Sequence, residues 1–551
     1  MPQLYTEKKF ENFREIICNS AERFSRQTAF VTKIEEGKYR NINYIDLKNY
    51  YYAFCTYMIE QGMLGKKIAV MGANCFEWVL SYLCASTVGT VVPIDKELQA
   101  EDVNSFIESA ECDMVLTDAA RIEKLRGIVT RDVKYVDFAN IFDIAASYKA
   151  DSKAVNAIKI GKDDERIIIF TSGTTGSSKG VCLSQYNICA NINSTVQMVK
   201  VTPEDRTLSI LPLHHTYECT LNCILFISRG APITYCDGLT KIQKNLTEYQ
   251  PTILVVVPAL LKVLNKRIKS AIIKDCPSLF RKYFETMSLA DALKKCPFVV
   301  RKLICSKVKK SLGGKIRLFI VGAADLDTQL VEDFGALGIR TLQGYGLTEC
   351  APLLAGNNDF HLNKASTGPA IPDVQIKIDN PNDEGVGEIL AKGENIMLGY
   401  YNDPEATDAV FSDGWFRTGD LGCLDNEGDL YIKGRIKNVI VTENGKNIYP
   451  EELETRIAEC PEVGEVLVYG SEENGETFVK AKIFPNLEYL KEKFGDKKPS
   501  EEEIKAAVQN AIKTVNSKIP NYKHIKIVEV LSSALEKTTT QKIKRFGKNI
   551  K

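Results

Sequence analysis

Residues 167–180 strongly constrain the fold of this chain. The apolar run Ile167–Phe170 is typical of a buried strand, and it leads into Thr171-Ser-Gly-Thr-Thr-Gly-Ser-Ser-Lys179-Gly180, a loop of glycines, hydroxyl side chains and one lysine. Backbone N–H groups in such a loop can crowd around a polyphosphate, while the hydroxyls add donors and Lys179 adds a point charge. We therefore expect a strand, a phosphate-binding loop and then a helix.

The loop differs from the common phosphate-binding loop, which has a glycine directly before the lysine, because Ser178 stands there. A flexible Gly/Ser/Thr surface loop is the alternative interpretation of the same composition. The rest of the chain decides between the two.

Apolar strands alternate with helical segments through most of the chain. Lys67–Leu98 has the pattern strand, helix, strand, and Arg317–Val321 is a strand followed by Gly322-Ala-Ala and a helix after Asp325. This alternation predicts an α/β fold with parallel-type sheets covered by helices on both faces. Gly322 and the loop after Phe170 both follow strands, where open α/β sheets place ligands.

The sequence pattern changes after about residue 385. Glycine-punctuated short strands between residues 385 and 434 predict a β-rich sub-lobe of a large, multi-lobed N-terminal domain, residues 1–436. Residues 437–551 predict a small mobile α+β domain, of a usual domain size. Its expected strands and helix are Glu465–Gly470, Thr477–Phe484, the helix Glu501–Val515 and the strand Ile525–Val530.

Composition excludes several classes of protein. The 551 residues include 71 basic and 71 acidic ones, so the net charge gives no argument for a nucleic-acid partner or for an anionic membrane. Sixteen scattered cysteines without an export signal favour reduced thiols in a cytoplasm, and four histidines argue against a zinc site. Trp78–Ile94 is too short and too polar to span a bilayer and predicts a buried helix running into a strand.

The segment Lys262–Lys315 is expected to be helical, and it is strongly basic. Its default interpretation is a solvated helical face. The alternatives are docking to an anionic membrane surface or to an acidic carrier protein.

Four further motifs follow the loop in order along the chain. They are Gln343-Gly-Tyr-Gly-Leu-Thr348-Glu349, Gly414-Trp-Phe-Arg-Thr-Gly-Asp420, Gly434-Arg435-Ile-Lys437 and Lys537-Thr-Thr-Thr-Gln-Lys542. In this order the set resembles the acyl-adenylate-forming (AMP-binding) superfamily, which includes acyl-CoA synthetases, adenylation domains of peptide synthetases and firefly luciferase. The resemblance covers nearly the whole chain and favours phosphate binding over a plain surface loop.

The resemblance implies that ATP and Mg²⁺ bind here and that CoA is a co-substrate. Such an enzyme directs a carboxylate oxygen at the α-phosphorus of ATP, so catalysis is positioning and charge neutralisation. By resemblance, Thr348 donates to the α-phosphate, Asp420 accepts from the ribose hydroxyls and Arg435 contacts ribose or phosphate. By resemblance, the phosphate-loop residues are Thr171, Ser172, Gly173, Thr174, Thr175, Gly176 and Lys179. Tyr345 would stack on adenine, with Gly322, Ala323 and Ala324 lining the other side, and Gln343, Gly344 and Gly346 are further expected nucleotide-binding residues.

Glu349 is the expected Mg²⁺ ligand, with the Thr174 hydroxyl nearby, because a carboxylate beside a phosphate site suits this hard cation. Without its neighbours, Glu349 would be interpreted as a helix N-terminal acid, Tyr345 as core and Asp420 as part of a turn. Lys542 is the catalytic lysine by resemblance, although Gln541 replaces the glycine that usually precedes it.

By resemblance, Lys437 is the hinge about which the small domain rotates after adenylation. Gly445 resembles the glycine beside the pantetheine tunnel, and a turn glycine is its alternative interpretation.

The segment Leu211-Pro-Leu-His214-His215-Thr-Tyr217-Glu218 matches the family segment that borders the acyl pocket. It lacks the aspartate with which amino-acid-activating members hold an ammonium group, and it looks more like long-chain acyl-CoA synthetases. His214, His215 and Tyr217 are therefore expected to line the substrate site. His215 could equally gate the acyl channel or satisfy a hydrogen bond in the core.

Three hypotheses follow. The first is a medium- or long-chain fatty acyl-CoA synthetase that releases AMP and pyrophosphate. The second is an enzyme that transfers the acyl group to a carrier-protein thiol or that activates an aromatic acid. The third is a non-catalytic nucleotide-binding or docking protein, against which the presence of Lys542, Glu349 and Asp420 argues.

Overall fold

The computed structural model of this chain describes residues 4–171, 178–441, 447–473, 476–495, 499–537, 543–545 and 549–550. The chain forms two compact units, here called unit 1 and unit 2. Unit 1 comprises Met1–Ile376 and Ala391–Phe416, and unit 2 comprises Lys377–Leu390 and Arg417–Lys551. The predicted boundary at Lys437 lies inside unit 2, and its role as a hinge stays a prediction.

The first sheet of unit 1 has eight strands in the order β14-β13-β12-β11-β9-β10-β1-β2. Its central strands are parallel, and the edge pairs β1–β2 and β13–β14 are antiparallel. Strands β12 and β13 end at the two predicted adenine segments. The bounds are β1 Thr28–Glu35, β2 Lys38–Asn43, β9 Thr207–Ser209, β10 Ile233–Tyr235, β11 Ile253–Val256, β12 Leu318–Val321, β13 Arg340–Gly346 and β14 Leu353–Gly356.

The second sheet of unit 1 has seven strands in the order β17-β8-β7-β4-β3-β5-β6. The predicted strand–helix–strand unit after Lys67 is confirmed as β3, α3 and β4, and α3 is almost entirely buried. The bounds are β3 Lys67–Met71, β4 Thr90–Ile94, β5 Cys112–Thr117, β6 Lys134–Asp137, β7 Ile167–Thr171, β8 Lys179–Leu183, β17 Gly399–Tyr400 and α3 Phe76–Val88.

The prediction that a helix directly follows the Gly/Thr loop is wrong. Strand β8 follows it and pairs antiparallel with β7, from Ile167 opposite Leu183 to Thr171 opposite Lys179. Val181-Cys-Leu183 is buried on both faces, as a strand inside a covered sheet must be. The helix α8, Gln185–Met198, begins only after the capping residue Ser184.

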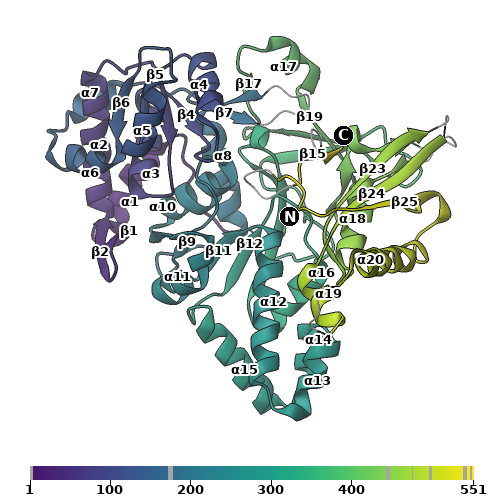
Figure 1. Ribbon diagram of the computed structural model, residues 1–551. Coiled ribbons are helices and arrows are strands. Elements are labelled where there is room, and N and C mark those ends of the chain that lie inside the picture. Colours follow the sequence, from purple (N-terminus) through teal and green to yellow (C-terminus); the bar gives the residue numbers. More distant parts are fainter. Residues whose placement is uncertain are drawn as a thin grey trace. The chain divides into compact units, whose positions relative to one another are not determined.

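Helices cover both sheets of unit 1 (Figure 1), which confirms the predicted α/β class. The largest hydrophobic core joins side chains from both sheets and from α1, α2, α3 and α8, with Trp78, Tyr44 and Phe30 among its largest members. The remaining helices are α1 Phe13–Phe24, α2 Tyr44–Glu60, α4 Ala100–Ser109, α5 Ala119–Arg126, α6 Phe138–Ser147, α7 Ser152–Ala157, α9 Thr216–Glu218, the π-helix Cys219–Ile224, α10 Leu225–Arg229, α11 Ile242–Tyr249, α16 Thr328–Ala336 and α17 Pro404–Val410.

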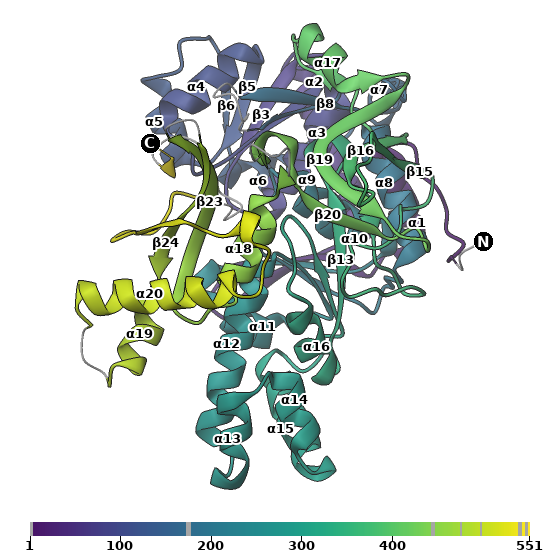
Figure 2. The same cartoon turned by 90° about the vertical axis from the view of Figure 1, so that its right-hand side faces the viewer.

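Four helices between β11 and β12 form a helical extension of unit 1 (Figures 1 and 2). It confirms the predicted helical character of the basic segment. Its Phe284, Leu289 and Leu293 belong to a hydrophobic cluster that also includes residues of β9, β11, β12, α11 and α16. The helices are α12 Pro258–Asp275, α13 Ser278–Thr286, α14 Leu289–Lys295 and α15 Phe298–Ser311.

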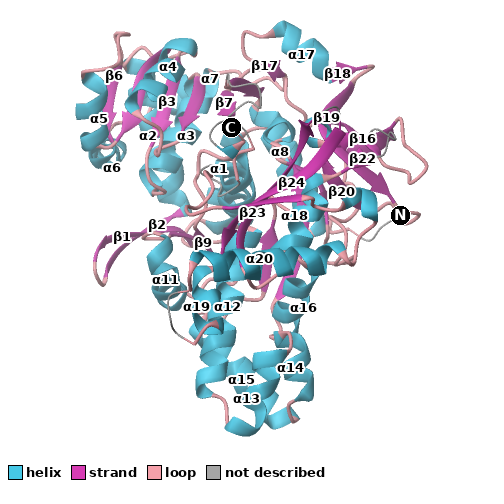
Figure 3. Ribbon diagram, turned by 45° about the vertical axis from the view of Figure 1, so that its right-hand side comes forward, coloured by secondary structure: helices cyan, strands magenta, loops and turns pink. Residues whose placement is uncertain are grey.

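Unit 2 contains a three-stranded sheet, β23-β24-β25, in which β25 is parallel to β24. Helices α18 and α20 pack on it around Leu453, Val468, Ile483 and Val508 (Figure 3). These elements match the strands and the helix expected from the sequence. The bounds are α18 Pro450–Ala458, β23 Val463–Glu473, β24 Glu476–Pro485, α19 Leu487–Lys493, α20 Glu501–Asn516 and β25 Ile527–Val530.

The glycine-punctuated region forms a five-stranded sheet of order β15-β16-β19-β18, with β20 paired to β19. Its strands are β15 Val374–Asp379, β16 Gly387–Gly393, β18 Phe411–Ser412, β19 Trp415–Leu424 and β20 Leu430–Arg435. Among the described residues, no helix is both long enough and apolar enough to cross a membrane. All sixteen cysteines are free thiols.

Candidate active site

Tyr400 connects the predicted magnesium ligand to the predicted phosphate-binding lysine. Its hydroxyl donates a hydrogen bond to Glu349 Oε1 at 3.1 Å. The Nζ of Lys179 lies 4.7 Å from the centre of the Tyr400 ring, within cation–π range. Two residues that are far apart in sequence are thus held beside one aromatic ring.

Backbone pairing holds Tyr400 against the strand that follows the loop. Strand β17 is antiparallel to β8, with Tyr400 opposite Val181. On either side of this pair, Tyr401 N donates to Gly180 O at 2.7 Å and Leu398 N donates to Cys182 O at 2.9 Å. The position of Lys179 relative to Tyr400 therefore follows from the sheet.

Two buried asparagines hold the turn that carries Glu349. The side-chain amide of Asn191 on α8 donates to Cys350 O at 3.2 Å and to Leu353 O at 2.8 Å. The amide of Asn395 donates to the same two carbonyls at 3.0 and 2.9 Å. Glu349 itself lies in the short 3₁₀ turn Thr348–Cys350, rather than at the N-terminus of a longer helix.

Sequence reasoning missed Tyr400, Asn191 and Asn395. The fully buried Asn191 on α8 gives one signal, because a polar side chain inside a buried helix must find partners. Tyr400 gives no comparable signal, since its contact with Glu349 spans 51 positions.

The predicted adenine segments lie at the ends of β12 and β13. Ala323 follows β12 with a φ of +72°, an uncommon conformation for a residue with a side chain. Gln343, Gly344, Tyr345 and Gly346 end β13, and a Cβ at Gly346 would lie 1.9 Å from Pro352 O. Gly346 is therefore needed for the close approach of two backbones.

Tyr217 packs against the first of these segments. Its hydroxyl lies 3.2 Å from Val256 O and 3.1 Å from Ile320 O, at the ends of β11 and β12. A Cβ on Gly322 would lie 3.1 Å from the Tyr217 ring, so the missing side chain leaves room for it. Burial raises the pKa of the Tyr217 hydroxyl. Tyr217 thus joins the predicted acyl-pocket segment to the predicted adenine segment.

The two histidines of this segment lie side by side, with ring centres 4.0 Å apart. His214 is buried, with Nε2 3.7 Å from Asp95 Oδ2. Burial lowers the pKa of His214 to about 3, so its ring is neutral at neutral pH and does not form an ion pair with Asp95. His215 is half-buried.

Glu218, the next residue after Tyr217, belongs to a buried polar network. Ser209 Oγ and Asn222 Nδ2 each donate to its Oε1 at 2.6 Å, and Asn74 in turn donates to Ser209 Oγ at 2.9 Å. Complete burial raises the pKa of Glu218 to about 8, partly opposed by these hydrogen bonds. Asn222 lies in the π-helical segment that follows, a feature often found at functional sites.

In unit 2, Asp420 and Arg435 form a close pair. They are opposite each other on β19 and β20, and Arg435 Nε lies 2.8 Å from Asp420 Oδ1. Asp420 is buried, and Thr418 Oγ1 accepts a hydrogen bond from its backbone N–H at 3.1 Å. Lys437 lies in the short 3₁₀ turn Ile436–Asn438 directly after β20.

The structure places the described nucleotide-site residues of unit 1 near the ends of β7, β8, β12 and β13. Thr171 and Lys179, which flank the loop, face each other across the β7–β8 hairpin. The other predicted residues lie outside the described part of the chain, namely Ser172, Gly173, Thr174, Thr175, Gly176, Gly445 and Lys542.

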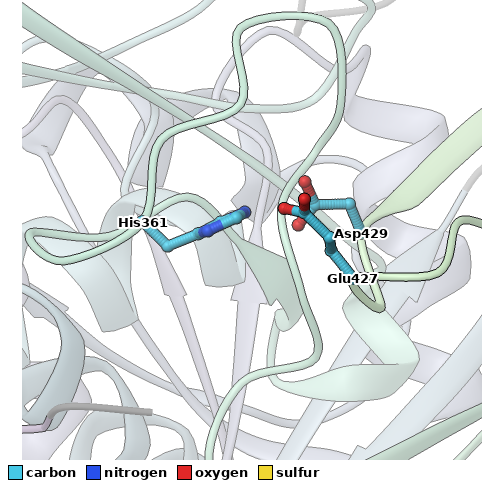
Figure 4. A group of neighbouring side chains, drawn as sticks. All are labelled: His361, Glu427 and Asp429. Atoms are coloured by element: carbon cyan, nitrogen blue, oxygen red, sulfur yellow. The ribbon is translucent and has the colours of Figure 1, made fainter.

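Glu427 and Asp429 come from the turn between β19 and β20 and are drawn with His361 in Figure 4. These three are residue types that can ligate a metal. His361 belongs to unit 1, whereas the two acids belong to unit 2. We base no metal site on them.

Comparison with known proteins identifies the family. Residues 18–401 match the family model described as AMP-binding enzyme. The chain belongs to the AMP-binding enzyme family. Residues 437–547 match a second model, the C-terminal domain of AMP-binding enzymes. The resemblance inferred from the ordered motifs is thus confirmed.

The curated relatives include several ligases of long-chain acids. The chain is 29% identical over 466 residues to long-chain-fatty-acid–CoA ligase 5 of Rattus norvegicus, covering 77% of this chain and 67% of the relative. It is 30% identical over 471 residues to long chain acyl-CoA synthetase 4 of Arabidopsis thaliana, covering 77% and 70%. The family and these relatives support adenylate-forming acyl-CoA ligase chemistry.

Solved structures agree on the fold. A crystal structure of ATP-bound MatB from Rhodopseudomonas palustris aligns with a TM-score of 0.75 at 23% identity, covering 97% of each chain. O-succinylbenzoate coenzyme A synthetase (MenE) from Bacillus subtilis, in complex with ATP and a magnesium ion, aligns with a TM-score of 0.73 at 21% identity, covering 98% of this chain and 99% of that one.

Proposed function

We propose that this chain activates a medium- or long-chain fatty acid with ATP and transfers the acyl group to CoA. The observation that carries the nucleotide half of the proposal is the contact of Tyr400 with both Glu349 and Lys179. A carboxylate and an ammonium group beside one aromatic ring, at the base of a Gly/Thr hairpin, form a suitable place for a metal–polyphosphate group.

The chemistry proceeds in two balanced steps. A carboxylate oxygen of the acid bonds to the α-phosphorus of ATP while the bond to the β-phosphate oxygen breaks, which releases pyrophosphate. The CoA thiol, having lost its proton to solvent, then bonds to the acyl carbon, and AMP leaves with its electron pair. The protein contributes alignment and charge neutralisation to both steps.

The described residues fit a magnesium ion in part. Glu349 offers a carboxylate oxygen ligand, and the Tyr400 hydroxyl orients that carboxylate, as residues behind metal ligands commonly do. Thr174 is the second proposed ligand. The ion, when bound, would neutralise phosphate charge during pyrophosphate departure.

The remaining roles are those that the resemblance assigns. Tyr345 and residues 322–324 would line adenine, Thr348 would donate to the α-phosphate, and Asp420 and Arg435 would bind the ribose side. Lys542 would neutralise charge between the α-phosphate and the acid. Rotation at Lys437 would then bring the small domain, with Gly445 beside the thiol tunnel, into the thioester-forming position.

Two observations support a fatty acid over an amino acid. The relatives named above are ligases of long-chain fatty acids or synthetases of long-chain acyl-CoA. In addition, the one carboxyl group of the pocket segment, Glu218, is fully buried, and its pKa of about 8 keeps it mainly uncharged at neutral pH, so it offers no negative charge to a substrate ammonium group. We place the reaction in the cytoplasm.

The test supplies ATP and magnesium with acids of graded chain length, with CoA or a carrier protein as acceptor, and measures AMP. We expect the highest kcat/KM with medium- or long-chain acids and CoA. Best turnover with aromatic acids, or a strict requirement for carrier protein, would replace the proposed substrate or acceptor. No AMP with any acid would favour a non-catalytic nucleotide-binding protein.

A further inference from the structure

An excess of positive charge is concentrated in one segment of this chain. Residues 262–315 hold fifteen of the 71 basic residues and three of the 71 acidic ones, so they carry a net charge of +12 while the rest of the chain carries −12. The whole segment belongs to the helical extension and the turn after it. A chain with no net charge therefore presents one strongly positive region.

The same extension exposes large apolar side chains. Leu279 at the start of α13 is 77% exposed, and Phe298, Val299 and Leu303 at the start of α15 are 66%, 66% and 65% exposed. These values are high for leucine, phenylalanine and valine. Single exposed apolar residues are ordinary, but four of them on two helices of one basic extension need a reason.

The packing of α13 and α15 explains why these side chains point outward. Phe280 and Tyr283 on α13, and Val300 and Ile304 on α15, pack against the hydrophobic cluster that the extension shares with the first sheet. Leu279, Phe298, Val299 and Leu303 lie on the remaining faces of the same turns. These four side chains are therefore not needed to anchor α13 and α15, because other apolar residues of each helix already pack against the hydrophobic cluster.

Basic side chains are interleaved with the exposed apolar ones. Arg281 and Lys282 are exposed within three positions of Leu279, and Arg301 and Lys302 are exposed between Val299 and Leu303. The Arg301 guanidinium carbon lies 5.7 Å from the centre of the Phe298 ring.

An ion pair links α15 to the end of α12, the helix directly before α13. Lys307 Nζ on α15 lies 2.7 Å from Asp275 Oδ2, the last residue of α12, directly before the turn into α13. Figures 2 and 3 show α13 and α15 together at the end of the extension remote from the sheets of unit 1.

We propose that this end of the extension docks on an anionic lipid membrane. Apolar side chains would insert among the headgroups while the surrounding cations face the negative surface, the arrangement of helices that lie in the membrane interface. A membrane surface suits a net charge of +12 spread over several helices, because its anionic groups are as dispersed as the cations. The chemical identity of the acid substrate does not enter this inference.

The test is co-sedimentation of the full chain with vesicles of phosphatidylcholine alone and with vesicles in which about a third of the lipid is phosphatidylserine or phosphatidylglycerol. We expect binding to both anionic compositions, little binding to phosphatidylcholine, and loss of binding as salt shortens the range of the attraction. Equal binding to neutral and anionic vesicles, or binding to neither, would overturn the proposal.

Two variants separate the contributions. R281Q/K282Q/R301Q/K302Q removes the four interleaved cations and should weaken anionic-vesicle binding about a hundredfold or more, since each basic residue near such a surface contributes about fivefold. L279S/V299S/L303S should weaken binding while leaving its salt dependence in place. The matched control K124Q/K149Q/K153Q/K159Q removes four exposed lysines elsewhere in unit 1 and should bind like the unmodified chain.

The ligase reaction with a water-soluble acid checks folding, and all three variants should retain it. If the quadruple variant binds vesicles normally, or if the control loses as much binding, the extension is not the docking surface. Capture of an acidic carrier protein by the extension without any vesicle binding would assign it to a protein partner and would also overturn the proposal.

Discussion

The hydroxyl of Tyr400 donates to the carboxylate of Glu349 across 3.1 Å. This contact joins strand β17 to the turn that follows β13, and the same ring lies beside Lys179. The proposed metal ligand Glu349 and the proposed phosphate-binding residue Lys179 therefore both contact Tyr400, and a change at Tyr400 should affect both.

Tyr400→Phe removes the hydrogen bond and keeps the ring. A hydrogen bond to a charged group contributes about 1.5–3 kcal/mol, and because this one is partly solvated we expect kcat/KM for AMP formation to fall about tenfold. The magnesium concentration needed for half-maximal rate should rise. The neighbouring Tyr401→Phe is the control. Equal losses in the two variants, or no loss in Tyr400→Phe, would show that the contact does not orient Glu349.

Glu218→Gln tests the buried carboxyl. Its pKa is raised to about 8 in the folded protein, so between about pH 5 and pH 8 the folded state holds a proton that the unfolded state releases. Stability from this site is therefore fully present at low pH and is lost as pH rises through that window. Glutamine cannot titrate, so the melting temperature of Glu218→Gln should fall less steeply with pH than that of the unmodified chain. Parallel curves from pH 5 to pH 8 would contradict the raised pKa.

Arg435→Gln separates binding from stability in unit 2. The Arg435 side chain is 45% exposed, so its ion pair with Asp420 should contribute about 1 kcal/mol or less to folding. We expect little change in the denaturant midpoint and a rise of about tenfold in the KM for ATP. Arg417→Gln removes an ion-paired arginine of the neighbouring strand β19 and should leave the KM for ATP unchanged. A normal KM in Arg435→Gln would remove Arg435 from the nucleotide site.

Much of the fold could be predicted, because the spacing of apolar residues along the chain indicates its strands and helices. The Lys67–Ile94 unit, the helical extension and the strands of the three-stranded sheet all follow from apolar patterning. Strand β8 was mistaken for the start of a helix because Val181-Cys-Leu183 is apolar on both faces and so lacks the alternation of a half-buried strand.

The site was harder to predict than the fold. Ordered motifs named Glu349, Asp420 and Lys179, but no pattern links Tyr400 to Glu349, since their contact depends on β17 pairing with β8. The outward-facing apolar residues of α13 and α15 were likewise invisible, because burial distinguishes Leu279 from Phe280 only once the helices have packed.

Lys542→Ala tests the division of labour between the two half-reactions. If Lys542 acts only on the α-phosphate during adenylation, AMP formation from the acid should fall about 100-fold or more. Thioester formation from a supplied acyl-adenylate should stay near its normal rate. Lys548→Ala, a lysine of the same C-terminal segment, is the control. Equal loss of both half-reactions in Lys542→Ala would contradict rotation at Lys437.

The acyl-adenylate itself can be tested directly by isotope transfer. A fatty acid labelled with ¹⁸O at both carboxylate oxygens is converted with ATP, magnesium and CoA, and the masses of the products are measured by mass spectrometry. Attack by the carboxylate on the α-phosphorus, followed by thiol attack on the acyl carbon, must leave one labelled oxygen in each AMP. Unlabelled AMP, with the isotope in pyrophosphate, inorganic phosphate or water instead, would contradict the proposed mechanism.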